Sequence, residues 1–175
     1  AFLSKEQVVA QWHHCMWAHT VRAEQASQEI LPQLRVRHIQ AGQHVWHTGD
    51  APPGWIGVLR GAAKICVPTE DGRSITLCGY AGSWFGETYL LRERSAMDCD
   101  AIALHDLTML ILPVTAFDAL RQSSPLFSQF LLVLMGGRTH PLMRSLTAQQ
   151  CTSVTSRVAQ CLGSLITPMN FPFPD

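Results

Sequence analysis

The residues with the clearest capacity for chemistry lie in one short stretch, Gly82 to Ala96, which reads GSWFGETYLLRERSA. Gly86 has no side chain to keep a ligand away from the backbone, and the carboxylate of Glu87 beside it can accept a hydrogen bond from a hydroxyl group. Arg94 and Ser95 then supply a guanidinium and a hydroxyl, which together suit an anion through charge-assisted hydrogen bonds. The stretch therefore predicts a pocket for a small anion that carries a hydroxyl group.

The same residues also allow a structural interpretation. Gly86 can serve a turn that needs a positive φ, and Glu87 can stabilise the first turn of a short helix by about 0.3–1 kcal/mol. Arg94 can then pair with Glu87 or Glu93 in a salt bridge that supports the fold. Both interpretations stay open from the sequence.

A second stretch, WHHCMWAH from Trp12 to His19, is rich in side chains that bind metals. On a helix Cys15 and His19 lie four residues apart and share a face, as two ligands of a metal ion or a haem would. His13 and His14 point in different directions, and two ligands do not close a site. We therefore favour helix packing here and predict no metal site.

Other histidines carry weaker signals. His38, His44 and His47 lie near the first predicted strands, but successive strand residues face opposite sides, so these imidazoles need not converge. His105 and Asp106 are adjacent without a nucleophile nearby, and a polar turn is the favoured interpretation. The sequence also lacks the G-x-S-x-G and G-x-x-x-x-G-K motifs. We predict no catalytic residues and a protein that is not an enzyme.

The composition is typical of a soluble folded domain. Of the 175 residues 47% are hydrophobic, and 13 basic side chains balance 13 acidic ones. Because a nucleic-acid-binding domain usually carries a basic excess, contact with DNA would need another segment. The apolar runs fall far short of the roughly 18 residues of a membrane span, and no signal-peptide pattern is present. We expect a cytoplasmic protein without membrane contact.

The six cysteines are scattered and form no C-x-x-C pair, which disfavours a zinc site and a cysteine-held cluster. We expect reduced, mostly buried thiols. Cys66 and Cys78 flank Asp71-Gly72. If those two residues are the centre of a tight turn, Cys66 lies opposite Leu77 and the two thiols face opposite sides of the sheet.

Short strands are predicted between two helical regions. Ser4 and Gln7 form a capping box, and a second helical piece covers Arg22 to Leu34 with a break near Pro32. Turn residues then recur every 8 to 12 positions, and the strands predicted between them cover residues 36–40, 43–47, 55–59, 62–67, 74–80, 96–104 and 108–112. The pattern predicts a mainly β barrel or sandwich with flanking helices.

A long amphipathic helix is predicted after the strands. Its apolar positions follow the spacing i, i+3, i+4, i+7 and i+8: Phe127, Phe130, Leu131, Leu134 and Met135. The stripe stalls at Gly136-Gly137 and Pro141 and then resumes to Leu165. Such a helix carries more apolar surface than one domain covers, so we expect a homodimer formed through it.

A framework of glycine motifs runs through the strand region. It comprises Ala41-Gly42-Gln43, Gly49-Asp50, Val58-Leu59-Arg60-Gly61, Asp71-Gly72-Arg73 and the Gly82 to Glu87 stretch, followed by Arg94-Ser95-Ala96 and residues 153–160. In order and approximate spacing this framework resembles the cyclic AMP receptor protein (Crp/Fnr) family of bacterial transcription regulators. The resemblance covers roughly residues 35–165. It implies a double-stranded β-helix (jelly roll) of the cyclic nucleotide-binding type, with N-terminal helices and a long C-terminal dimerisation helix.

The resemblance also implies a domain organisation and partners. Residues 1–34 would be an N-terminal helical segment, 35–122 the β-roll effector domain, 123–167 the dimerisation helix with a short helix after it, and 168–175 a linker. The linker would lead to a winged helix-turn-helix domain that reads DNA, which we expect to be absent from this sequence. The implied partners are a second copy of the chain, DNA through that domain, and a small-molecule effector.

The ligand-binding residues implied by the resemblance are Phe85, Gly86, Glu87, Thr88, Arg94, Ser95, Ala96, Leu142 and Met143. If this chain binds a cyclic nucleotide as such members do, Glu87 would accept a hydrogen bond from the ribose 2′-hydroxyl, and Thr88 would lie beside it. Arg94 and Ser95 would hold the phosphate. No cofactor or metal is implied, and the effector is a cyclic nucleotide or another organic ligand.

The chain departs from the nucleotide-binding pattern in three places. The connection from Leu91 to Arg94 is two or three residues shorter, which shifts Arg94 along the pocket wall. Leu142 and Met143 stand where binding members place Thr or Ser against the purine, and they suit an apolar pocket or, preferably, the dimer interface. The helix is also disturbed just before them, at Pro141.

Two other functions stay open. One is a stand-alone cupin-like enzyme or carrier whose β-roll holds a metal ion, and the other is an interaction module without an effector. We predict the effector-sensing and dimerisation portion of a transcription regulator, because the glycine framework and the long helix occur together.

Overall fold

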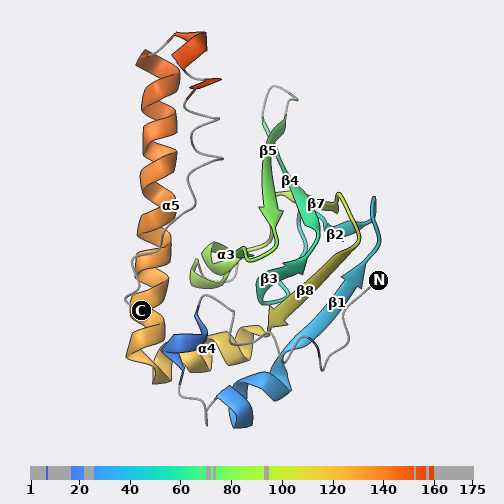
Figure 1. Cartoon of the computed structure of the whole chain (residues 1–175). Coiled ribbons are helices and arrows are strands. Elements are labelled where there is room, and N and C mark those ends of the chain that lie inside the picture. Colours follow the sequence, from blue (N-terminus) through green and yellow to red (C-terminus); the bar gives the residue numbers. More distant parts are fainter. Residues whose placement is uncertain are drawn as a thin grey trace. The chain divides into compact units, whose positions relative to one another are not determined.

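The structure is a computed structural model, and it describes residues 7, 17–21, 26–69, 72, 74–92, 95–151, 153–156, 158 and 159 (Figure 1). The chain divides into two compact units, Ala1–Ser124 and Pro125–Asp175, and each is described by itself. The predicted capping box at Ser4 and most of the helix after it lie outside the described residues. Between residue 17 and the first strand, the described residues include the short helical turns η2 (Ala18–Thr20), η3 (Ala26–Ile30) and η4 (Leu31–Gln33). The change from η3 to η4 next to Pro32 confirms the predicted break.

In the described part of the chain, strands pair into two four-stranded antiparallel sheets, which confirms the predicted β-roll (Figure 1). One sheet has the order β1 (Arg35–Ile39), β8 (Leu107–Leu112), β3 (Trp55–Arg60) and β6 (Trp84–Phe85). The other has the order β2 (His44–Trp46), β7 (Asp100–Ala103), β4 (Ala62–Pro68) and β5 (Ser74–Tyr80). The strand β6 was not predicted, and β7 begins at Asp100 instead of residue 96.

The core of the roll is built by alternating apolar residues of both sheets. One buried cluster unites Val45 and Trp46 of β2 with Val58 of β3, Ala101 of β7 and Met109 of β8. The strand β8 is buried along its whole length, as expected for a strand covered on both faces. The strand β8 pairs with β3, and β3 in turn pairs with β6, so the buried sheet supports the strand that leads into the candidate site.

The β4–β5 hairpin differs from the predicted tight turn. Pro68 pairs with Ser74, and beyond this pair the amide of Gly72 donates to the carbonyl of Thr69 over 3.0 Å. The register is shifted by one residue, and Cys66 pairs with Thr76. The predicted pairing of Cys66 with Leu77 is wrong, because the last strand pair is Pro68 with Ser74 and a turn centred on Asp71-Gly72 would require a different register.

The strand β2 contains a bulge. His44 pairs with Ile102, whereas Trp46, two residues later, pairs with Ala101, so β2 carries one extra residue. Val45 and Trp46 are consequently both buried. An extra residue reverses the alternation of side chains, and it brings His44 and His47 to the same side with ring centroids 4.0 Å apart.

The described residues also form the helices α3 (Glu87–Leu91), α4 (Val114–Ser123) and α5 (Pro125–Cys151). The predicted buried stripe of α5 is confirmed by Phe127, Phe130, Leu131 and Leu134. The predicted interruption is wrong, since α5 runs unbroken through Gly136-Gly137 and Pro141. Proline removes one amide donor, and the helical bonds on either side hold the backbone of a 27-residue helix. In the described part of the chain, no helix is both long and apolar enough to cross a membrane.

Candidate functional site

The candidate ligand turn is formed where β6 runs directly into α3. β6 is anchored on β3, with Phe85 opposite Ile56. Gly86 connects the two elements with a φ of 98°, and a Cβ atom on it would lie 3.4 Å from the carbonyl oxygen of Gly54. The left-handed conformation favours glycine at this position. The predicted positive-φ role of Gly86 is therefore confirmed.

The carboxylate of Glu87 is buried and accepts a hydrogen bond inside the protein. Glu87 is the first residue of α3 and is 1% exposed. Its Oε2 accepts a hydrogen bond from Nε1 of Trp55 over 3.0 Å. Because an ionised carboxylate is costly to bury without hydrogen bonds, this contact helps Glu87 to remain at the base of the turn. The residue expected to accept a ribose hydroxyl thus also has a structural partner.

A cluster of aromatic rings fixes the indole that holds Glu87. The centroid of Trp55 lies 5.2 Å from that of Trp17, 4.6 Å from that of Trp84 and 5.7 Å from that of Phe117. All four side chains are buried. Tilted and edge-to-face contacts of this kind are favourable, so packing sets the orientation of the indole and through it that of the carboxylate.

The residue before the turn, Phe85, packs into the roll. Its ring centroid lies 5.5 Å from that of Trp46. A Cβ atom on Gly79 would lie only 3.1 Å from Cε1 of Phe85, so the bare backbone of Gly79 leaves room for the ring. Phe85 therefore anchors the turn in the core of the roll.

Tyr89 joins α3 to the segment that follows it. The Tyr89 hydroxyl donates a hydrogen bond to Oδ1 of Asp98 and lies 3.5 Å from Sγ of Cys99. Burial first, and then the bonds to Asp98 and Cys99, raise the pKa of the phenol well above its ordinary value. The phenol consequently keeps its proton and acts as a donor. This contact ties the ligand turn to residues 95–100.

The segment with the predicted phosphate ligands is held by backbone bonds. The amide of Ser95 donates to the carbonyl of Arg92 over 3.1 Å. The amide of Met97 donates to the carbonyl of Asp50, and the carbonyl of Met97 accepts from the amide of Gly49. Ser95 is half-buried and Ala96 is exposed. The bond to Arg92 therefore keeps the Ser95 backbone next to the end of α3.

Six of the nine predicted residues lie in two described segments of the roll. Phe85, Gly86, Glu87 and the exposed Thr88 form one turn, and Tyr89 ties that turn to the segment with Ser95 and Ala96. Arg94 lies outside the described residues. Leu142 and Met143 belong to α5, in the other unit; Met143 is exposed, and the side chain of Leu142 is outside what is described.

Sequence reasoning missed the two contacts that organise this site. Trp55 and Glu87 are 32 positions apart, and no local pattern pairs them. Tyr89 and Asp98 are nine positions apart, and no local pattern pairs them either. The polar turn predicted at His105 and Asp106 is confirmed. Asp106 lies in the connection between β7 and β8, where its Oδ1 accepts from the amide of Ala41 over 3.2 Å.

Comparison with known protein families gives a match over residues 36–124 to the cyclic nucleotide-binding domain. This region is 89 of the 175 residues and runs from the second residue of β1 to the residue after α4. No curated protein matches the chain in sequence.

Several solved structures share the fold. The catabolite activator protein of Thermus thermophilus is 23% identical with a TM-score of 0.64, over 75% of this chain and 62% of that one. The sensor domain of the transcriptional regulator DNR from Pseudomonas aeruginosa is 19% identical with a TM-score of 0.65, over 79% and 91%. A Eubacterium rectale protein described as a Crp/Fnr-family regulator is 17% identical with a TM-score of 0.71, over 87% and 71%.

Proposed function

The chain belongs to the cyclic nucleotide-binding domain family, and from that premise we propose that it is the effector-sensing and dimerisation portion of a Crp/Fnr-type transcription regulator. In this proposal a small ligand binds beside the β6–α3 turn and controls DNA binding by a further domain. The protein acts by binding and not by catalysis, and it works in the cytoplasm, where the DNA is. Three structural neighbours described as an activator or regulators support the assignment.

The observation that carries the proposal is the linked pair of segments around α3. The turn of Gly86 to Thr88 and the segment of Ser95 and Ala96 are separate in sequence, and the bond from Tyr89 to Asp98 joins them. A ligand that contacts both segments would change how they are held together. Such a change is what an effector needs in order to bias one of two conformations.

The chemistry of the two segments favours a small anion with hydroxyl groups. The exposed hydroxyl of Thr88 and the half-buried hydroxyl of Ser95 can each donate or accept a hydrogen bond. Arg94, next to Ser95 in sequence, supplies the positive charge. A cyclic nucleotide meets this description and is our first candidate. Glu87 contributes by positioning the turn through its hydrogen bond with Trp55.

Dimerisation is proposed through an exposed stripe of α5. Leu132 is 74% exposed and Met143 is 60% exposed. They are eleven residues apart, so at about 100° per residue they lie within about 20° of the same helix face. Gly136 lies between them, and a Cβ atom there would have no neighbour within 4 Å. An apolar stripe with a small residue in it suits close packing against the same stripe of a second copy.

The test is a thermal-shift screen of the purified chain combined with light scattering. Cyclic AMP, cyclic GMP, 2-oxoglutarate and a phenolic acid are each added in large excess. A ligand at 100 times its Kd should stabilise the fold by about 2.7 kcal/mol. The proposal predicts a dimer that is stabilised by at least one of these ligands. A monomer that none of them stabilises would instead favour an interaction module without an effector.

A further inference from the structure

Two histidines and one aspartate converge on the surface of the roll, apart from the candidate effector residues. His44, His47 and Asp100 each offer one ligand atom, and these atoms all lie within 4.8 Å of one another. The strand β2 supplies His44, His47 follows that strand, and Asp100 begins the paired strand β7. From this convergence we propose that His44, His47 and Asp100 bind a divalent transition-metal ion, with Zn²⁺ as the preferred ion.

The bulge in β2 places the two histidine side chains on the same side, where both can bind one metal ion. In a regular strand, residues three apart face opposite sides. The extra residue between His44 and Trp46 reverses this alternation. The two imidazoles therefore stand together at a centroid separation of 4.0 Å and an interplanar angle of 24°. Two imidazoles on one side of a strand can coordinate one ion.

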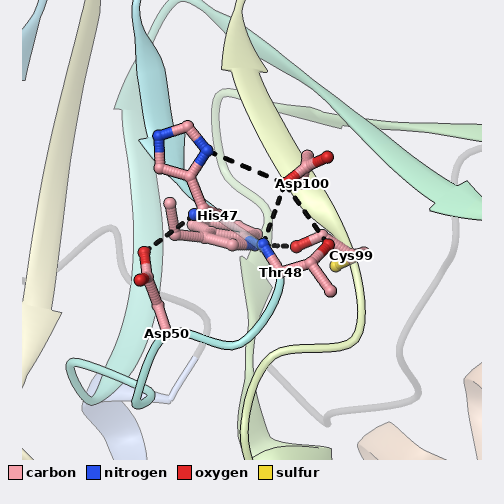
Figure 2. A network of polar contacts seen from close by, with 6 residues as sticks. His47, Thr48, Asp50, Cys99 and Asp100 are labelled. Atoms are coloured by element: carbon pink, nitrogen blue, oxygen red, sulfur yellow. Dashed lines mark hydrogen bonds and ion pairs between the residues drawn. The ribbon is translucent and has the colours of Figure 1, made fainter.

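The carboxylate is already oriented toward the imidazoles. Figure 2 shows Asp100 turned toward His47, with a distance of 3.9 Å from His47 Nδ1 to Asp100 Oδ1. The same oxygen accepts hydrogen bonds from the backbone amide of Thr48 over 2.8 Å and from its hydroxyl over 3.3 Å. The Thr48 amide makes the largest contribution to a lowered pKa of Asp100. Hydrogen bonds of this kind orient metal ligands in proteins.

The loop that carries His47 is also held in place. Figure 2 shows the Asp50 side chain below His47, where its Oδ2 accepts from the backbone amide of His47 over 2.8 Å. The amide of Asp50 in turn donates to the carbonyl of His47 over 3.1 Å. Gly49 then donates to the carbonyl of Met97 over 2.7 Å. The backbone is therefore fixed, and only the exposed side chains need to adjust.

The ligand types and the spacing suit zinc. Two imidazole nitrogens and one carboxylate oxygen match zinc, nickel or copper better than calcium or magnesium, which prefer sets of oxygen ligands. With bonds of about 2.0–2.2 Å, ligand atoms around tetrahedral zinc lie roughly 3.4 Å apart. Closing from 4.8 Å requires small rotations of exposed side chains, since His47 and Asp100 are 62% and 42% exposed. Water would occupy the fourth position.

This site differs from the metal site of a cupin-like enzyme. The three side chains lie on the outside of the roll, while the interior near β2 is filled by Val45 and Trp46. A metal ion here would cross-link β2 to β7 at the surface. It would not be positioned to act on a substrate enclosed by the roll.

The test is a calorimetric titration of the chelator-treated full chain with Zn²⁺. The double variant His44→Ala/His47→Ala removes two ligands, and Asp100→Asn keeps an acceptor for Thr48 while it removes the negative charge. His105→Ala is the matched control, because it removes an exposed imidazole from the connection between β7 and β8. Circular dichroism without metal verifies that each variant is folded, and His47→Gln provides a milder substitution.

The proposal predicts that the wild-type chain binds one more equivalent of Zn²⁺ than the double variant. Asp100→Asn and His47→Gln should weaken that equivalent by at least about tenfold, as expected when a ligand or its charge is lost. His105→Ala should retain it. Binding elsewhere in the chain would persist in every variant and does not affect the difference. Equal stoichiometry and affinity in the wild type and the double variant would overturn the proposal and leave His47 and Asp100 as a surface ion pair.

Discussion

Nε1 of Trp55 donates a hydrogen bond to Oε2 of Glu87 over 3.0 Å and thereby joins the aromatic cluster to the candidate ligand turn. Both side chains are essentially inaccessible to solvent. A carboxylate in this position contributes to stability whether or not a ligand is bound. Substitutions of Glu87 should therefore affect folding in the absence of any effector.

The variant Glu87→Ala should be less stable than the wild type. It leaves the buried indole N–H of Trp55 without this acceptor, and such a loss costs about 1–3 kcal/mol. For a chain of this size each kcal/mol lowers Tm by about 2–4 °C. Denaturant and thermal unfolding without ligand measure the effect.

The matched control is the neighbouring exposed residue. Thr88→Ala should change the free energy of unfolding by no more than about 0.5 kcal/mol, as is usual for surface substitutions. Glu87→Gln keeps an acceptor oxygen and should fall between the two. Equal stability of Glu87→Ala and the wild type would show that the bond to Trp55 contributes nothing to the fold.

The variant Tyr89→Phe should loosen the connection between α3 and residues 95–100. It removes the hydroxyl that donates to Asp98, a charged acceptor, and the expected cost is about 1.5–3 kcal/mol at neutral pH. Unfolding by denaturant measures the cost. Unchanged stability would contradict a structural role for this bond.

The same tyrosine should make stability fall at alkaline pH. Its pKa is raised in the folded state, so the stabilisation is fully present below the unfolded value of 10.0 and is lost as the pH rises above it. Wild-type stability should therefore decline above about pH 10 more steeply than that of Tyr89→Phe. Parallel pH profiles of the two proteins would show that Tyr89 is not perturbed.

The variant Leu132→Glu should dissociate the proposed dimer. It introduces a charge into the exposed stripe of α5, where desolvation and repulsion from its own copy across a two-fold axis both oppose association. Sedimentation at micromolar concentration should show a monomer. Gln122→Glu, an exposed position on α4, is the control and should leave the dimer intact. A dimer that survives Leu132→Glu would move the interface to another surface.

Sequence periodicity predicted the strands well because each has one or two buried faces. Six of the eight strands were predicted within two residues at both ends. The strand β6 is two residues long, too short to show a period, and was missed. The hairpin register and the bulge in β2 were also missed, since each depends on a single extra residue in a turn or a strand.

The sequence predicted those parts of the candidate site in which a local pattern requires a particular residue type. Gly86 was identified because a positive φ favours a specific residue type. The partner of Glu87 was not, because contacts between distant residues leave no local pattern. Likewise His44 and His47 seemed separate under strict alternation, and only the bulge brings them together.

The most direct test of the central claim is a calorimetric titration of cyclic AMP into the wild-type chain and into Arg94→Ala. We predict saturable binding of one ligand per chain, weakened by at least about tenfold, or 1.4 kcal/mol, in the variant that lacks the guanidinium. Ser95→Ala should weaken it in the same direction. The absence of binding to the wild type, or equal affinity for the wild type and Arg94→Ala, would contradict an anion site at this turn.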